Sequence, residues 1–217
     1  MAHSTDLEDT RSAKMGGVLP DLFDGTVYFW IALWLGLTAL ALTIDQPIYD
    51  FVRHRQHRAF MYVCDFMECM GGYSVHLLVL LIVAACRNWK RILVGYLTPM
   101  VGLAVFSTLV KYAVGRARPF SHLGAFHFEP LRHAGAHMNS FPSGDAVSAM
   151  ALATLLGIYF PRCRWLFLVV GLLASLARVA TGHHYLSDVV FGAGLAIAGV
   201  ALSVRLLGPL FYARSRG

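Results

Sequence analysis

The stretch "ILVGYLTPMVGLAVFSTLVKYAV", residues 92–114, decides the fold class of this chain. Its one charged residue, Lys111, lies close to the end of the run. A run of about 20 apolar residues is long enough to cross a bilayer as a helix. Backbone groups in lipid have no water to bond, so a single crossing segment has to be helical. The sequence therefore predicts a transmembrane helix over Ile92–Val114.

Five further hydrophobic runs flank this one: Thr26–Ile44, Gly71–Cys86, Val147–Phe160, Trp165–Ala180 and Val189–Leu207. The chain is 57% hydrophobic and 14% charged, whereas about 25% charged residues are usual in a soluble domain. We predict an all-α fold class, a polytopic membrane protein with six transmembrane helices in a bundle. Residues 1–217 form one domain, with a polar N-terminal segment (1–25) and a basic tail (208–217). Residues 47–70 mix aromatic, Met and Arg side chains, which predicts an interfacial helix.

The net charge of +6 indicates membrane orientation rather than a nucleic-acid partner. Lys and Arg gather at residues 11–14, 87–91, 162–164 and 214–216. Six helices place these groups on one side, which the positive-inside rule makes cytoplasmic. The other side is basic too, through Arg53, Arg55, Arg58, Arg116, Arg118 and Arg132. From the compact loops we predict the bacterial cytoplasmic (inner) membrane, with the site on the periplasmic or extracellular side; an internal eukaryotic membrane is the alternative.

Ionisable residues within or beside the spans predict a functional site. Lys111, Arg178, Asp145 and Asp188 lie at helix ends that alternation brings to one surface, and Arg118 follows the third span. Three cations near an apolar wall need counter-charge, and a phosphate dianion with bidentate bonds from Arg would supply it. The turn at residues 143–144 adds backbone N–H groups at a helix N-terminus, which favour an anion.

The stretch "ARVATGHHYLSD", residues 177–188, supplies a nucleophile. His184 and Asp188 are four residues apart, so on a helical turn they face the same way. Asp188 can then accept a hydrogen bond from one imidazole nitrogen and leave the other unprotonated. A neutral, oriented imidazole beside a cationic pocket is a nucleophile for phosphorus.

Three motifs resemble those of the type 2 phosphatidic acid phosphatase (PAP2) superfamily of membrane lipid phosphatases. "KYAVGRARP" (111–119) resembles Lys-x6-Arg-Pro, "PSGD" (142–145) resembles Pro-Ser-Gly-His, and 177–188 resembles Ser-Arg-x5-His-x3-Asp. The resemblance implies that His184 attacks phosphorus to form a phosphohistidine and that Asp188 orients it. It implies phosphate binding by Lys111, Arg118, Ser143, Gly144 and Arg178. It also implies a hydrolase of lipid phosphates or diphosphates that needs no metal or other cofactor.

Two residues depart from the family pattern. Ala177 replaces a Ser, which costs one hydroxyl beside Arg178, and Asp145 replaces the His that protonates the leaving oxygen. A carboxyl group is a poor acid at pH 7, and three readings stay open. Asp145 is the catalytic acid; or it is a helix-dipole or ion-pair residue while His183, His137 or no acid serves; or the protein is impaired. Under the second reading we expect a preference for lipid diphosphates, whose leaving group needs little protonation.

Two rival functions stay open. One is a lipid phosphotransferase with the same intermediate, and the other is a non-catalytic lipid-phosphate binder. The expected partners are a lipid phosphate substrate, of the polyprenyl diphosphate, phosphatidic acid, phosphatidylglycerol phosphate or lipid A type, and membrane lipids; the oligomeric state is not predicted. Arg116 is weighed evenly as a phosphate contact or a headgroup contact, and His76 is expected to be structural. The four cysteines lack zinc-site spacing, and we expect them to be unpaired.

Overall fold

The computed structural model describes residues 25–54, 58–86, 88–131 and 135–208. Its helices are α2 (Gly25–Arg53), α3 (Arg58–Gly71), α4 (Tyr73–Ala84), α5 (Trp89–Val114), α6 (Gly144–Tyr159), α7 (Arg164–Ala180) and α8 (Leu186–Leu206). Short 3-10 turns are η1 (Pro119–Ser121), η2 (Gly135–Met138) and η3 (Pro161–Cys163). Most of the polar N-terminal segment and the basic tail, together with Arg55, Arg87, Arg132 and His133, lie outside the described residues. Within the described ranges the chain forms helices and loops, and the predicted all-α fold class is confirmed.

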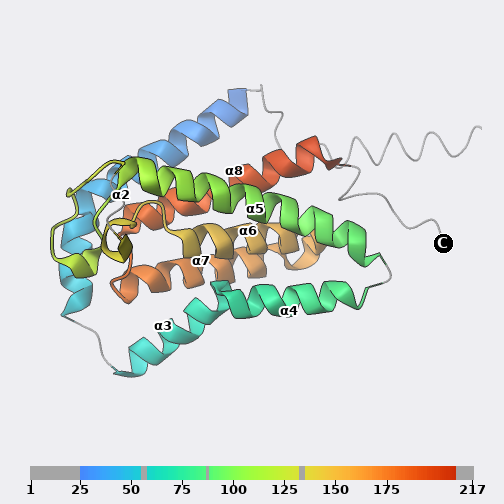
Figure 1. Ribbon diagram of the computed structural model, residues 1–217, viewed down its shortest axis with the longest axis horizontal. Helices are drawn as coiled ribbons and strands as arrows, with labels where there is room; N and C mark the ends of the chain where they lie inside the picture. The colour runs from blue at the N-terminus through green and yellow to red at the C-terminus, as the bar shows by residue number, and fades with distance from the viewer. Residues whose placement is uncertain (1–24, 55–57, 87, 132–134, 209–217) are drawn as a thin grey trace, which may run out of the picture.

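Five apolar helical stretches in the described part of the chain are long enough to cross a membrane: Val27–Arg53, Phe60–Ala84, Trp89–Val114, Pro161–Ala180 and Leu186–Leu206. The second combines α3 and α4, which meet at an angle near Gly72 (Figure 1). The segment predicted as an interfacial helix, 47–70, is divided between the end of α2 and most of α3. The helix α2 continues through Pro47, because neighbouring groups can satisfy the backbone that a proline frees in a membrane helix.

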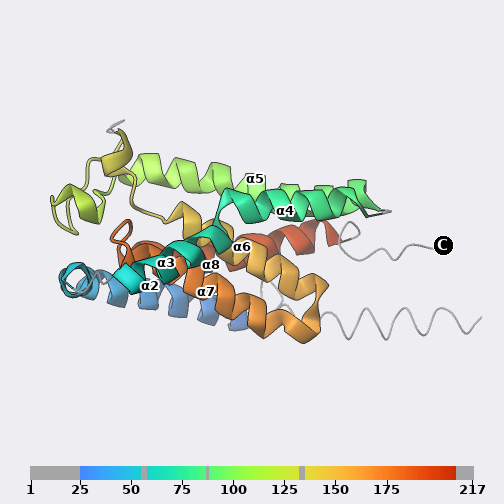
Figure 2. The same cartoon turned by 90° about the horizontal axis from the view of Figure 1, so that it is seen from below.

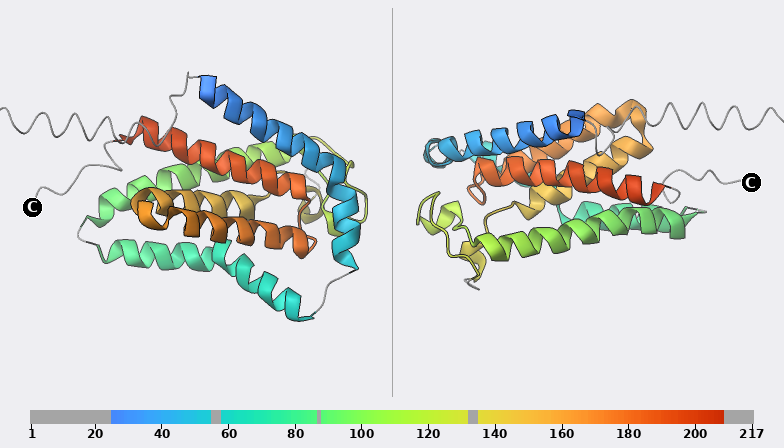
Figure 3. Two further views of the ribbon diagram at one scale, coloured as in Figure 1. Left: turned by 180° about the vertical axis from the view of Figure 1, so that it is seen from behind. Right: turned by 90° about the horizontal axis from the view of Figure 1, so that it is seen from above.

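The short helix α6 forms the centre of the bundle. Its buried side chains include Ala151 and Leu155, and it packs against α7, α8, α5 and α3. Figures 2 and 3 show α6 and α7 side by side, with α4 and α5 on one side of the bundle and α2 on the other. Close packing is possible because Gly171 of α7 faces α6; a Cβ there would lie 2.7 Å from Ala153 Cβ. Small residues at contacts are the usual device for joining membrane helices.

Large apolar side chains cover the outside of the bundle. Trp30, Leu81, Leu109 and Trp165 are each more than half exposed, and similar residues follow the outer faces of α2, α4, α5 and α7. Such a surface would be unfavourable in water, but it matches the hydrocarbon of a bilayer. The bundle therefore has the surface of a membrane protein.

The C-termini of α5 and α7 and the N-termini of α6 and α8 meet at one end of the bundle (Figure 1, left). The turn after α5 depends on Gly115, which has a left-handed φ of 57°. A Cβ at this position would lie 2.0 Å from the carbonyl oxygen of Glu129, so only glycine fits. This turn directs Arg116 and Arg118 back towards the helix ends, where the predicted site residues lie.

Candidate active site

His184 lies in the turn between α7 and α8 and is 2% exposed. Its Nδ1 is 3.6 Å from Asp188 Oδ2, and its Nε2 is 3.9 Å from Asp145 Oδ2. The predicted pair is brought together, although 3.6 Å is longer than a hydrogen bond. Burial lowers the pKa of His184 below its usual 6.5, and this outweighs the opposite effect of Asp188. The imidazole is therefore neutral at pH 7, which is the state that a nucleophile needs.

Asp188 is held rigidly by a buried network. Its Oδ2 accepts hydrogen bonds from Ser140 Oγ at 2.5 Å and from the Tyr185 backbone N–H at 2.9 Å. Its Oδ1 accepts from Arg116 Nη1 at 2.7 Å. The second bond closes the first turn of α8, so the carboxylate orientation is fixed by the helix start itself.

Arg116 is fully buried and belongs to this network. Its Nη2 donates to Asp45 Oδ2 of α2 at 2.7 Å, and its Nη1 donates to Ser187 Oγ at 2.7 Å. Asp45 also accepts the Ser187 backbone N–H at 2.9 Å. Arg116 therefore joins α2 to the start of α8. Because its side chain is fully buried in these contacts, it is not available to a lipid headgroup or to a phosphate. Both roles that the sequence left open for Arg116 give way to a structural one.

Lys111 and Arg118 face the same turn, and neither forms an ion pair with a carboxylate of the described residues. Lys111 Nζ donates to the carbonyl oxygen of Asn139 at 2.9 Å, and its side chain lies against Gly144. Arg118 Nε has no hydrogen-bond partner among the described residues, and its guanidinium lies over the Phe120 ring. Burial, and then the charge of Arg178, lower the pKa of Arg118. Two cations thus have no close neutralising group in the described structure, which favours an incoming anion.

Ser143 and Gly144 form the start of α6. Ser143 is the N-cap, and its Oγ accepts the backbone N–H of Ala146 at 3.3 Å. Its own backbone N–H donates to the carbonyl oxygen of Asp188 at 3.1 Å, which ties α6 to α8. Gly192 of α8 allows this approach, because a Cβ there would lie 2.9 Å from Ser143 O. The helix N-terminus therefore faces the site with its partial positive charge.

Arg178 is held between two carboxylates. Its Nη1 lies 2.5 Å from Glu68 Oε2 of α3, and its Nε lies 2.9 Å from Asp145 Oδ2. The Asp145 side chain is 51% exposed, while Arg178 is largely buried. Asp145 therefore lies beside both Arg178 and Nε2 of His184. A phosphoryl group in contact with both of these residues would have to occupy the same space.

The structure brings all eight predicted residues to one end of the bundle: Lys111, Arg118, Ser143, Gly144, Asp145, Arg178, His184 and Asp188. Sequence analysis missed Glu68 and Asp45. Both are carboxylates within long apolar segments, which is the signal that could have identified them. His76, expected to be structural, contacts Ser148 Oγ at 2.5 Å and the Tyr96 hydroxyl, away from His184.

The described residues include no group of three or more His, Cys, Asp or Glu side chains that could hold a metal ion. Cys64, Cys69, Cys86 and Cys163 are free thiols, as expected. The metal-free mechanism stays a prediction.

A family model described as the PAP2 superfamily matches residues 92–211, which is more than half of the chain. The chain belongs to the PAP2 superfamily. The match contains all three motifs at the site, whereas Asp45 and Glu68 precede it. The resemblance seen in the motifs is thus confirmed at the level of the family.

Several curated relatives are similar to this PAP2 protein. Lipid A 1-phosphatase of Rhizobium etli is 38% identical over 119 residues, which cover 54% of this chain and 49% of that protein. Lipid A 1-phosphatase of Porphyromonas gingivalis is 30% identical over 118 residues, 51% of this chain and 23% of that protein. Undecaprenyl-diphosphatase BcrC of Bacillus subtilis is 28% identical over 141 residues, which cover 65% of this chain and 66% of that protein. The chain spans about half or less of the lipid A 1-phosphatases that it matches.

Two solved structures share the PAP2 fold. A transmembrane PAP2 type phosphatidylglycerolphosphate phosphatase from Bacillus subtilis has a TM-score of 0.64 and 20% identity, covering 87% of this chain and 98% of that one. LpxE of Aquifex aeolicus has a TM-score of 0.56 and 19% identity, and the match covers 75% of this chain and 95% of that one. At these identities the likeness establishes the fold, and it places the chain among polytopic membrane proteins.

Proposed function

We propose that the protein is a membrane lipid phosphatase that acts through a phosphohistidine on His184. One observation carries the proposal. His184 is buried beside Asp188 on its Nδ1 side, and its Nε2 side faces Asp145 and Arg178. An imidazole that has one nitrogen beside a fixed carboxylate and the other directed at an arginine that can bind phosphate is suited to attack phosphorus as a nucleophile.

In the proposed reaction His184 Nε2 bonds to phosphorus, and the bond from phosphorus to the lipid oxygen breaks. Lys111, Arg118 and Arg178 neutralise the phosphoryl oxygens, while the start of α6 offers N–H groups near Gly144. Water then attacks phosphorus, the P–N bond breaks, and inorganic phosphate leaves. Asp188 stabilises the imidazole throughout, and the arrangement uses fixed cations where other phosphoryl-transfer sites use a metal.

The substrate we propose has an activated leaving group. The relatives named above comprise lipid A 1-phosphatases and an undecaprenyl-diphosphatase. A sugar 1-phosphate releases an anomeric oxygen and a diphosphate releases a phosphate, and both leave more easily than an alkyl alcohol. Such leaving groups suit a site where Asp145 is paired with Arg178. We therefore place a lipid A-type 1-phosphate or a polyprenyl diphosphate ahead of phosphatidic acid and phosphatidylglycerol phosphate.

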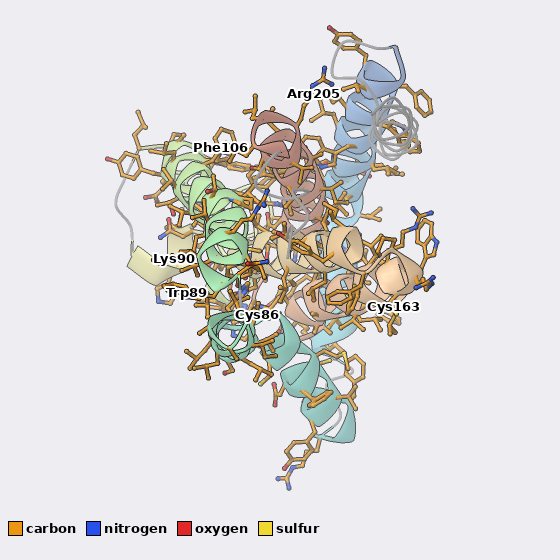
Figure 4. All side chains as sticks on the ribbon, turned by 90° about the vertical axis from the view of Figure 1, so that its right-hand side faces the viewer. Cys86, Trp89, Lys90, Phe106, Cys163 and Arg205 are labelled. Carbon is orange, nitrogen blue, oxygen red and sulfur yellow. The ribbon has the colours of Figure 1, made fainter. Side chains whose placement is uncertain are left out.

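The site is proposed to face the periplasm or the outside of a bacterial inner membrane. The opposite end of the bundle holds Lys90, Arg162, Arg164 and Arg205, and Figure 4 looks onto this end. At the site end Arg116 is buried in ion pairs and Arg118 belongs to the site, so neither counts as a free loop charge. Arg53 and Arg58 remain at the site end, fewer than the cations at the opposite end, and this asymmetry supports a cytoplasmic position for the end with Lys90.

The test is phosphate release in detergent, with EDTA present, from a lipid A 1-phosphate, a polyprenyl diphosphate, phosphatidic acid and phosphatidylglycerol phosphate. We expect release that persists in EDTA and is lost in His184→Ala. His54→Ala, which changes an exposed histidine at the end of α2, is the matched control and should keep full activity. Release that survives in His184→Ala would refute the phosphohistidine route.

The same experiment separates the two rivals. A phosphotransferase would need an added lipid or sugar acceptor before the substrate is consumed. A non-catalytic binder would retain the lipid without releasing phosphate, and Asp145→His would restore turnover. Equal kcat/KM on a diphosphate and a monophosphate of one lipid would reject the argument from leaving groups.

A further inference from the structure

A chain of hydrogen bonds links α3 to the residue next to the proposed nucleophile. Glu68 Oε1 accepts a hydrogen bond from Thr181 Oγ1 at 2.6 Å, while its Oε2 contacts Arg178. Thr181 Oγ1 lies 2.9 Å from His183 Nδ1. Glu68 lies outside the region that matches the family model, so no motif assigns it a role.

The hydroxyl group of Thr181 fixes the tautomer of His183. Besides His183, its neighbours are Glu68 Oε1 at 2.6 Å and the carbonyl oxygens of Ala177 and Arg178 at 3.0 and 3.4 Å. All three accept hydrogen bonds and cannot donate, and the Glu68 carboxylate is both charged and at the shortest distance, so the single hydroxyl proton points to Glu68. The contact with His183 therefore has Nδ1–H as donor, which leaves Nε2 of the neutral ring as a base.

His183 stands among the charged groups of the site. Its ring meets Phe120 edge to face at 6.1 Å, and Phe120 also contacts His137 and lies under Arg118. Burial and then the charge of Arg178 lower the pKa of His183, Glu68 opposes them, and smaller effects come from Arg118, which lowers it, and Asp145, which raises it. Groups from α3, α6, α7 and the loop after α5 thus all act on this imidazole.

We infer that His183 is the proton-transfer residue of this site and that Glu68, acting through Thr181, is the positioning residue that orients it. The inference rests on the proposed phosphatase function. Asp145 is paired with Arg178, whereas His183, the residue before the nucleophile, keeps Nε2 as a base because its Nδ1 contacts Thr181. A proton-transfer imidazole one residue before the nucleophile takes the role that Asp145 fills poorly.

The proton balance closes over one turnover. When water attacks the phosphohistidine, His183 Nε2 takes one water proton, the O–P bond forms, and the bond between His184 and phosphorus breaks. Inorganic phosphate leaves, and His184 is neutral again. In the other half-reaction His183 gives this proton to the lipid oxygen as the bond from that oxygen to phosphorus breaks. Leaving group and water occupy the same position opposite His184, so one base can serve both.

The experiment follows phosphohistidine formed on the purified full chain from radiolabelled p-nitrophenyl phosphate, whose leaving group needs no proton. We expect His183→Gln to form the intermediate and to hydrolyse it at least about 100-fold more slowly than wild type. Thr181→Val removes the hydroxyl group but not the contact between Glu68 and Arg178, and should slow hydrolysis about tenfold, as for one lost orienting hydrogen bond. Thr181→Ser keeps the hydroxyl group and should retain the wild-type rate.

Hydrolysis at the wild-type rate in His183→Gln, or equal rates in Thr181→Val and Thr181→Ser, would overturn the inference and leave the phosphatase function standing. Failure of His183→Gln to form phosphohistidine would overturn it too. A wild type that forms no phosphohistidine would overturn both proposals. Independently of turnover, nitrogen-15 NMR of labelled histidines, recorded at a pH where the His183 ring is neutral, should show His183 as the Nδ1–H tautomer in wild type, and an Nε2–H tautomer would contradict the relay.

Discussion

At the scale of single residues, Asp145 has a position that its motif does not explain. Its carboxylate contacts Arg178 Nε at 2.9 Å and lies 3.9 Å from His184 Nε2. These are the groups that a phosphoryl oxygen would meet, so Asp145 acts as an internal anion in the free protein. The pairing supports the reading in which Asp145 neutralises a basic residue.

A phosphate that binds Arg178 must therefore displace Asp145. Removing the negative charge of Asp145 should then strengthen the binding of anions. We predict that Asp145→Asn lowers the inhibition constant of inorganic phosphate by up to about fivefold, since a half-exposed ion pair is worth about 0.2–1 kcal/mol. The assay is competitive inhibition of lipid dephosphorylation. Asp145→Glu keeps the charge and serves as the control, and weaker inhibition in Asp145→Asn would show that Asp145 helps to hold phosphate.

At the scale of elements, Arg116 connects helices that are far apart in sequence. It pairs with Asp45 of α2 and Asp188 of α8, and all three side chains are fully buried. Removing the cation alone would leave two buried carboxylates without a positive charge beside them. Such a loss costs about 3–5 kcal/mol, although a buried pair adds little net stability over an apolar replacement.

We predict that Arg116→Leu lowers the thermal unfolding temperature in detergent strongly and reduces turnover, because Asp188 loses a fixed partner. The double variant Arg116→Leu with Asp45→Asn should recover part of the stability, since one buried charge is then removed. Arg162→Leu, in the turn η3, changes an exposed arginine and is the control. A stability of Arg116→Leu close to wild type would contradict the role of the network.

The elements also show how far sequence reasoning reaches. The motif residues could be placed together because each lies at a helix end and alternation fixes which ends meet. The contact between Glu68 and Arg178 could not be predicted, because the two residues are 110 positions apart. Neither the hydrophobic periodicity of the helices nor the spacing within a motif encodes a contact over that distance. The same holds for Asp45 and Arg116, 71 residues apart. The division of 47–70 between two helices was also missed, since composition gives polarity but not a helix boundary.

At the scale of the whole molecule, the two ends of the bundle differ in charge, and the candidate site lies at one of them. Cys163 is exposed at the end that we place in the cytoplasm, and Leu123 is exposed at the site end. In a chain whose other cysteines are replaced by alanine, we predict that a membrane-impermeant maleimide leaves Cys163 unlabelled in intact spheroplasts. Leu123→Cys, in a chain that also lacks Cys163, should be labelled. The reverse pattern would invert the orientation.

The shortness of α6 sets the depth of the candidate site in the membrane. Its 16 residues rise about 24 Å at about 1.5 Å per residue, less than the roughly 30 Å of hydrocarbon in a bilayer. Its C-terminal end leads into the basic turn with Arg162 and Arg164, which belongs in water, so the end at Ser143 is the one that stops short. A lipid phosphate that reaches His184 must therefore lie deeper in the membrane than the neighbouring headgroups, while its acyl or prenyl chains stay in the leaflet. Under the proposed function the protein meets its substrate in two dimensions, and its rate follows the mole fraction of that lipid in the membrane rather than its amount per volume of solution.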